Sequence, residues 1–258
     1  MTVSIDMTRP ESAQVEIGSV SVLRPFAWLA LGLTDLTRCA PANLAHGLLM
    51  TLLGWMLLLM LGNHPYFVAA AVTGFLLAAP IMTTGICELS RRRMRGEALG
   101  FDASLEALNR HGSALFKFGM VLSLIVAVWF ATSEVMLRTV FNVAAPSVAD
   151  TYYSGFIDSA NRSQIVAYIA TGAVLALIVL LASVVTVPMI IDRHVRASEA
   201  IRASWRVVAA NPLAMLVWAA LIVALTAIGF ATLLFGMIVL IPLLGHATWH
   251  AYRDLVRR

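Results

Sequence analysis

Two histidines near the C-terminus, His246 and His250, have the spacing that could support metal chemistry. On a helix they lie one turn apart on the same face, where two imidazoles could bind zinc, copper or a haem iron. His46, His111 and His194 are expected near the same membrane face and could supply a third ligand. No HExxH arrangement, carboxylate-rich ligand set or CxxC motif accompanies the pair. Because histidine, tryptophan and tyrosine are also common at membrane interfaces, we favour an interfacial role and predict no cofactor.

Motifs for other chemistry are missing as well. The sequence contains no GxSxG, no P-loop and no dinucleotide fingerprint. Serine, histidine and aspartate occur, but no spacing places them as a catalytic triad. We therefore predict that the protein is not an enzyme.

The composition indicates which medium surrounds these residues. Hydrophobic residues make up 60% of the 258, charged residues only 12%, and the mean hydropathy is +0.86. A soluble domain has about a quarter charged residues, because much of its surface must face water. The sequence therefore predicts an all-α integral membrane protein.

A helix needs roughly 20 apolar residues to cross the hydrocarbon core, where only internal hydrogen bonds satisfy its backbone. Leu213–Leu244 is too long for one span, and we divide it near Ala227–Thr232, with Gly229 at the turn. The sequence then predicts six transmembrane helices at about residues 44–61, 66–87, 115–135, 165–191, 212–228 and 231–247, within one domain over residues 24–258. Residues 1–23 are polar and lack the features of a signal peptide, so we expect a disordered cytoplasmic tail.

The basic residues support an even number of spans. With six spans, all of the eighteen except Arg138 and Arg162 lie on one side, which the positive-inside rule makes the cytoplasm. Both termini and Cys39 and Cys87 are then cytoplasmic, so no disulfide is expected. The run Arg91, Arg92, Arg93 and Arg95 is interpreted as a topology signal that also contacts anionic lipid headgroups. This distribution explains the net charge of +4 without nucleic acid.

Three segments of the sequence follow one order of features, which predicts three hairpin repeats. Each has a short amphipathic stretch, an arginine, two spans and a proline before basic residues. The arginines are Arg38, Arg110 and Arg206, and the prolines are Pro80, Pro188 and Pro242. We expect each entry to be a short interfacial helix at the cytoplasmic face, and each proline to kink its span near that face.

Ionisable residues are almost absent from the middle of the predicted spans. Glu88, Glu134 and Asp192 lie at span ends, where Arg91, Arg138 and Arg193 are near enough to pair with them. Ion-coupled transport usually needs such groups near the midplane, so their absence argues against a secondary transporter.

Four segments carry a resemblance to a known family. They are Pro25–Leu48, Cys87–Glu97, Ala200–Ala219 and Gly245–Val256, the last with the sequence GHATWHAYRDLV. Together they resemble a bacterial family of predicted integral membrane proteins of unknown function, over nearly everything after Arg24. The Ser-Trp-Arg…Asn-Pro piece is also similar to membrane domains attached to some glycerophosphodiester phosphodiesterases. The family resemblance implies six helices and an inner-membrane location, but no activity and no catalytic residues.

These observations lead us to expect a non-catalytic inner-membrane protein that packs with lipids, a membrane-protein partner or a second copy of itself, for example in assembly or envelope maintenance. Two alternatives stay open. One is a transporter or channel for a small or amphipathic solute, and the other is a metal- or haem-linked accessory protein that uses His246 and His250.

Overall fold

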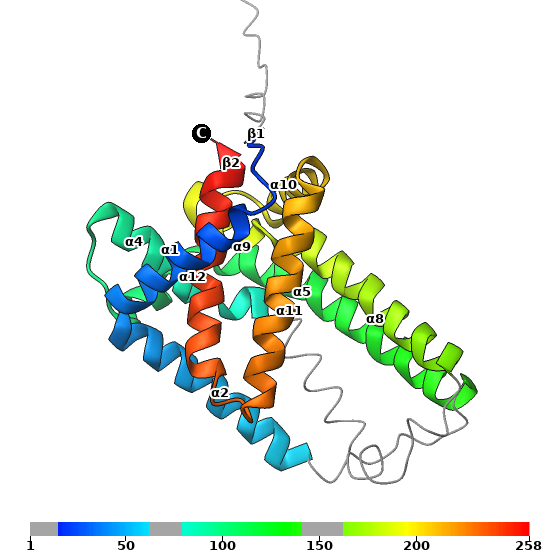
Figure 1. Cartoon of the computed structure of the whole chain (residues 1–258). Coiled ribbons are helices and arrows are strands. Elements are labelled where there is room, and N and C mark those ends of the chain that lie inside the picture. The colour runs from blue at the N-terminus through cyan, green and yellow to red at the C-terminus, as the bar shows by residue number, and fades with distance from the viewer. Residues whose placement is uncertain (1–14, 62–78, 141–161, 258) are drawn as a thin grey trace, which may run out of the picture.

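The structure is a computed structural model that describes residues 15–61, 79–140 and 162–257 of the chain (Figure 1). Almost every element in these ranges is a helix, which confirms the all-α prediction. The helices are α1 (Arg24–Arg38), α2 (Ala40–Leu61), α4 (Thr84–Arg95), α5 (Phe101–Val140), α8 (Arg162–Ser183), α9 (Thr186–Arg193), α10 (Ala197–Ala210), α11 (Pro212–Ala231) and α12 (Met237–Leu255). Two short strands, β1 (Glu16–Ile17) and β2 (Val256–Arg257), pair antiparallel.

Within residues 15–61, 79–140 and 162–257, four helical segments are long and apolar enough to cross a membrane. They are Ala40–Leu59, Phe101–Met136, Val166–Arg193 and Pro212–Ala231. They coincide with four of the predicted spans, although the second extends well beyond residues 115–135 at its N-terminal end. Residues 66–78 of the predicted span 66–87 lie outside the described residues. The predicted span 231–247 falls in α12, which is not among the four, since its second half is polar.

The C-terminal apolar stretch forms two helices, as predicted, but they separate at Thr232–Gly236 rather than at Ala227–Thr232. In this turn Leu233 and Leu234 have φ angles of 52° and 68°. Gly229 lies inside α11, where a Cβ atom would come within 2.6 Å of the Met237 side chain. The glycine therefore lies at the contact between the two helices and does not form the turn.

The predicted entry helices are present in two of three places. α1 and α10 are separate short helices, and Cys39 and Asn211 divide them from α2 and α11. The expected short helix before the second hairpin is wrong, because α5 continues unbroken from Phe101 to Val140. Proline accounts for the difference. Pro41 and Pro212 lie at the start of α2 and α11, whereas no proline occurs in α5.

The exit prolines also act differently from one another. Pro188 cannot donate to the carbonyl of Val184, and the chain is interrupted at Val184–Val185, between α8 and α9. α12 continues through Pro242. A break at the proline is thus observed for α9, while α12 tolerates its proline within a continuous helix.

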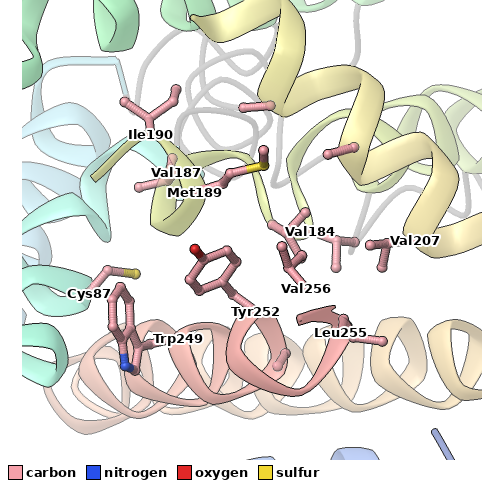
Figure 2. Packing of buried hydrophobic residues seen from close by; sticks show 14 of the residues in the cluster. Cys87, Val184, Val187, Met189, Ile190, Val207, Trp249, Tyr252, Leu255 and Val256 are labelled. Carbon is pink, nitrogen blue, oxygen red and sulfur yellow. The ribbon is translucent and has the colours of Figure 1, made fainter. Parts of the chain in front are cut away.

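The short helices α1, α4, α9 and α10 lie with the second half of α12 and the β1–β2 ladder at one end of the molecule, which we call the polar end. α2, α11 and the first half of α12 run away from it on one side, and α5 and α8 run side by side on the other (Figure 1). Figure 2 shows Tyr252 rising from α12 toward Val187 and Met189 of α9, with Trp249 beside Cys87 of α4. The principal core therefore lies at the polar end and holds its short helices together.

Residues 15–23 are part of this fold, which differs from the disordered tail expected over residues 1–23. Gly18 N donates to the carbonyl of Leu255 at 2.8 Å, and Asn211 Nδ2 donates to the carbonyl of Gly18 at 3.0 Å. Residues 1–14 lie outside the described residues. The segment just before α1 is thus fixed to the last residues of α12 and to the start of α11.

Candidate functional site

The polar end contains a group of buried polar side chains contributed by four helices. Asp35 of α1, Ser90 of α4 and His246 of α12 are each 0% exposed, and Asn43 of α2 is 2% exposed. With Arg93 and His250 these residues form what we call the buried polar cluster. Asp35 is placed there because it shares one face of α1 with Pro25, Trp28 and Gly32, all of which are buried.

The carboxylate of Asp35 is the centre of this cluster. Its Oδ2 atom accepts a hydrogen bond from Ser90 Oγ at 2.6 Å and lies 3.1 Å from His250 Nε2. Its Oδ1 atom faces the guanidinium of Arg93, with which it forms an ion pair. A buried carboxylate is costly unless it is paired and hydrogen-bonded. These three partners meet that need, and they tie α1 to α4 and α12.

His246 uses both ring nitrogens in the cluster. Nε2 lies 2.9 Å from Asn43 Oδ1, and Nδ1 lies 2.7 Å from Ser90 Oγ. Asn43 Nδ2 donates to the carbonyl of Leu36 at 3.0 Å, so Asn43 Oδ1 must accept from His246. Ser90 has a single proton, which is directed to Asp35. The contact between His246 Nδ1 and Ser90 therefore becomes a full hydrogen bond only when Nδ1 also carries a proton.

A second group of charges surrounds Glu88, whose side chain is fully buried. Its oxygens accept from Arg91 at 2.6 and 2.7 Å, from Arg92 at 2.9 Å and from Arg110 at 2.8 Å. Burial raises the pKa of Glu88, but the hydrogen bonds from Arg91 and Arg92 and the charge of Arg110 outweigh it, so the pKa is lowered overall. The carboxylate therefore stays ionised and joins α4 to α5.

Two further interactions fasten the end of α12. Tyr252 donates its hydroxyl proton to Asp192 Oδ2 at 2.8 Å, and burial is the main reason that the pKa of Tyr252 is raised. Asp254 accepts from Arg24 at 2.6 Å and from the Trp28 indole at 2.8 Å. Burial alone would raise the pKa of Asp254, but these two donors lower it overall. α12 is thus bonded to α9 on one side and α1 on the other.

The predicted pairs of acidic and basic residues are partly confirmed. Glu88 pairs with Arg91 as expected. The predicted pairing of Asp192 with Arg193 is wrong, since Asp192 contacts Arg95 at 3.3 Å while Arg193 donates to Tyr252 and to backbone carbonyls. The side chain of Arg138, the predicted partner of Glu134, is outside the described residues.

His246 and His250 share a helix face, but they do not converge on an open position. Their nearest common group is Asp35 Oδ2, at 3.8 Å from His246 Nδ1 and 3.1 Å from His250 Nε2. Within residues 15–61, 79–140 and 162–257, no three His, Cys, Asp or Glu side chains form a group that could hold a metal ion. His111 and His194 lie together, with ring centroids 4.7 Å apart, and His46 bonds Ser104 at 2.7 Å.

The arginine run of α4 is directed mainly at protein carboxylates. Arg91 and Arg92 are 4% and 8% exposed and are bonded to Glu88. Arg93 pairs with Asp35, and Arg95 pairs with Asp192 while staying accessible to solvent. A role in topology or headgroup binding for these four residues stays a prediction, and the structure adds the function of neutralising buried acids.

Sequence reasoning missed Asp35, Ser90 and Asn43. The sequence does carry a signal for Asp35, because positions 25, 28, 32 and 35 follow the spacing of one helix face and the other three are apolar or small. An aspartate at the fourth position indicates a buried partner elsewhere. Ser90 and Asn43 carry no comparable signal, since their roles depend on which helices become neighbours.

Chemically, the buried polar cluster has the residue types of an acyl-transfer site but not its arrangement. Ser90 contacts both Asp35 and His246, whereas in a triad histidine stands between serine and the carboxylate. All three side chains are fully buried, so Ser90 is not presented to a substrate. What the cluster does is hold α1, α2, α4 and α12 in one arrangement.

A bundle of apolar helices long enough to cross a membrane, fastened at one polar end, defines a polytopic α-helical membrane protein. Residues 67–192, just under half of the chain, match a family model described as Predicted integral membrane protein (DUF2189). This confirms the resemblance for Cys87–Glu97, whereas the other three motif segments lie outside the matched range. No curated protein and no solved structure matches the chain.

Proposed function

We propose that this protein is a non-catalytic component of a bacterial inner membrane, which works by packing its apolar helices against membrane partners or lipids. The observation that carries this proposal is the distribution of charged residues in the part of the chain that the structure describes. The buried acids at the polar end are neutralised by neighbouring arginines, as for Asp35 and Glu88. The spanning helices, by contrast, present large apolar side chains outward, such as Leu124 and Leu216 at 66% and 67% exposure.

The proposed topology has six spans in three hairpins, with both termini in the cytoplasm and residues 24–258 forming one domain. Pairing of β1 with β2 supports the even number, because it joins the segment before α1 to the segment after α12. The arginines that pair with Glu88, Asp35 and Asp192 also gather at this same end, as the positive-inside rule requires of a cytoplasmic face. The repeat is supported by the shared arrangement of α1 with α2 and of α10 with α11.

A reporter fused after Arg258 tests this topology. We expect a cytoplasmic reporter to be active in that fusion and a periplasmic one to be inactive. Activity only of the periplasmic reporter would show an odd number of spans and overturn it.

Packing against partners is tested by photo-crosslinking in native membranes. A photoreactive amino acid placed at Leu216, which is 67% exposed on α11, should form adducts with a membrane protein or lipid. The same residue placed at Trp218, which is 1% exposed on the same helix, should form none and serves as the matched control. The role fails if deletion of the gene leaves membrane complexes and lipid composition unchanged and Leu216 yields no adduct.

A further inference from the structure

The exposed face of α10 differs from the arginine run of α4. Arg202, Trp205 and Arg206 all lie on this face, and Trp205 is 48% exposed. The opposite face, which includes Ala200, Ala203 and Val207, is buried against the core. Positions 202, 205 and 206 lie on the same side of the helix within about one turn, so the two guanidinium groups and the indole ring share one exposed surface.

The arginines of α10 face no counter-charge from the described part of the protein. Among the residues that the structure describes, no carboxylate lies within 4.0 Å of Arg202 or Arg206, although Glu199 is on the same helix. Arg91, Arg92, Arg93, Arg95 and Arg110 each have such a partner. Two like charges at i and i+4 repel each other, and an anion placed between them removes that repulsion.

The position of α10 indicates what kind of anion would reach it. α10 ends at Ala210, and α11, one of the four candidate spans, begins at Pro212. Asn211, which separates the two helices, is buried. In the first turns of α11, Leu213 and Leu216 are 61% and 67% exposed. A lipid has the matching order of chemistry, with a charged headgroup above apolar chains. Tryptophan beside arginine is also typical of the headgroup level.

We propose that Arg202, Trp205 and Arg206 form a binding site for the headgroup of an anionic phospholipid, whose acyl chains lie along the exposed side of α11. This inference rests on the proposed membrane role and names the surface and the lipid class involved. The two arginines contact the phosphate, and the indole lies at the boundary between headgroup and chains. The exposed cations of α10 thus replace the run Arg91–Arg95 as the principal lipid contact.

Quenching of tryptophan fluorescence by brominated lipids tests the site on the full chain in mild detergent. Titrations with dibromo-phosphatidylglycerol and dibromo-phosphatidylcholine are compared between the wild type and Trp205→Phe. The difference isolates the signal of Trp205. We expect this signal to be quenched by phosphatidylglycerol at much lower concentration than by phosphatidylcholine. Arg202→Gln and Arg206→Gln should each raise the half-quenching concentration by about fivefold.

Arg257→Gln is the matched control, because it removes one arginine charge that is 59% exposed in β2 and that already faces Glu16 at 3.9 Å. It should leave the phosphatidylglycerol titration unchanged, and an equal shift would mean that net charge alone attracts the lipid. Equal quenching by both lipids would also overturn the site. So would complete competition by soluble glycerol phosphate, which would indicate a water-soluble anion as the ligand.

Two further measurements keep the result interpretable. Arg202→Lys and Arg206→Lys retain the charge and should keep the preference for phosphatidylglycerol even if a glutamine variant folds poorly. The crosslinking from Leu216 is read separately in the same variants. If a variant loses the preference for phosphatidylglycerol but still forms adducts from Leu216, the headgroup site is distinct from the packing role. If no adducts form from Leu216 in the absence of any arginine substitution, the packing role itself is contradicted.

Discussion

Gly47 of α2 lies directly against the backbone carbonyl of Ile238 in α12. Pro242, four residues beyond Ile238, has no N–H to donate to that carbonyl. The proline thus leaves an acceptor free within the helix, and the glycine allows the neighbouring helix to approach it closely enough for a Cα–H···O contact.

Gly47→Ala should destabilise the protein, because its Cβ atom would overlap the Ile238 carbonyl and force α2 away from α12. Overpacking of this kind costs about 1–3 kcal/mol. Gly112→Ala, in the interior of α5 with nothing within 4 Å of the added carbon, is the control and should be neutral or slightly stabilising. Thermal unfolding of both variants in the same detergent provides the comparison. Equal midpoints would contradict the close approach.

Asp35→Asn should destabilise the polar end by roughly 3–5 kcal/mol, because it leaves the Arg93 charge without its partner in a mostly buried place. The double variant Asp35→Asn with Arg93→Gln should recover part of the loss, since neither charge is then uncompensated. Unfolding midpoints of the two single variants and the double variant measure the coupling. Strict additivity of the two single effects would show that the residues act independently.

Stability should fall in two stages on acidification. Burial lowers the pKa of His250, so the folded state favours the neutral imidazole. The stability of the folded state that depends on this neutral ring is complete above the ordinary pKa of 6.5 and is lost as the pH falls below it. The lowered pKa values of Glu88 and Asp254 add stability that is present above their ordinary values of 4.5 and 3.8 and is lost below them. His250→Gln should make the first stage smaller and leave the second unchanged. Unfolding midpoints measured from pH 8 down to about pH 2.5 test both stages, and a single stage in the wild type would contradict the assignment.

Both cysteines should resist labelling by a thiol reagent in the folded protein. Cys39 and Cys87 are free and are 2% and 0% exposed, and burial raises the pKa of the Cys39 thiol, which lowers its thiolate fraction. Unfolding in strong detergent should expose two reactive thiols without any reductant. A cysteine introduced at Trp205 should react readily in the native state and serves as the positive control. Rapid labelling of the wild type would show that the polar end opens.

The sequence was sufficient for features that depend on apolar runs. Leu44–Leu61, Ile165–Ile191 and the two helices of the C-terminal stretch were located because hydrocarbon leaves a chain no alternative to a helix. The family resemblance was also correct where the family model matches. The predicted disruption at an exit proline is observed at Pro188, whereas α12 runs on through Pro242.

Features that depend on which helices become neighbours were not predictable. Arg93 could have paired with Glu97, just beyond the end of α4, yet it reaches Asp35 of α1, 58 positions earlier in the chain. Asp192 was expected to bind the adjacent Arg193, but a helix directs consecutive side chains to different sides, so Arg95 and Tyr252 are its partners. Because of this geometry, the pairs that can be read from spacing are those at i+3 or i+4, such as Glu88 with Arg91 and with Arg92.

The antiparallel pairing of β1 with β2 joins two segments that are synthesised first and last, so this end of the molecule closes late in synthesis. Asp35 can meet His246 and His250 only after nearly the whole chain has left the ribosome, because these partners lie more than 200 positions apart. Until then Asp35 has its partners Arg93 and Ser90 on α4 but lacks the two histidines of α12. Insertion of the helices must therefore precede closure of the ring of contacts at the polar end, and a nascent chain lacking α12 would be an unclosed intermediate suited to recognition by membrane quality control.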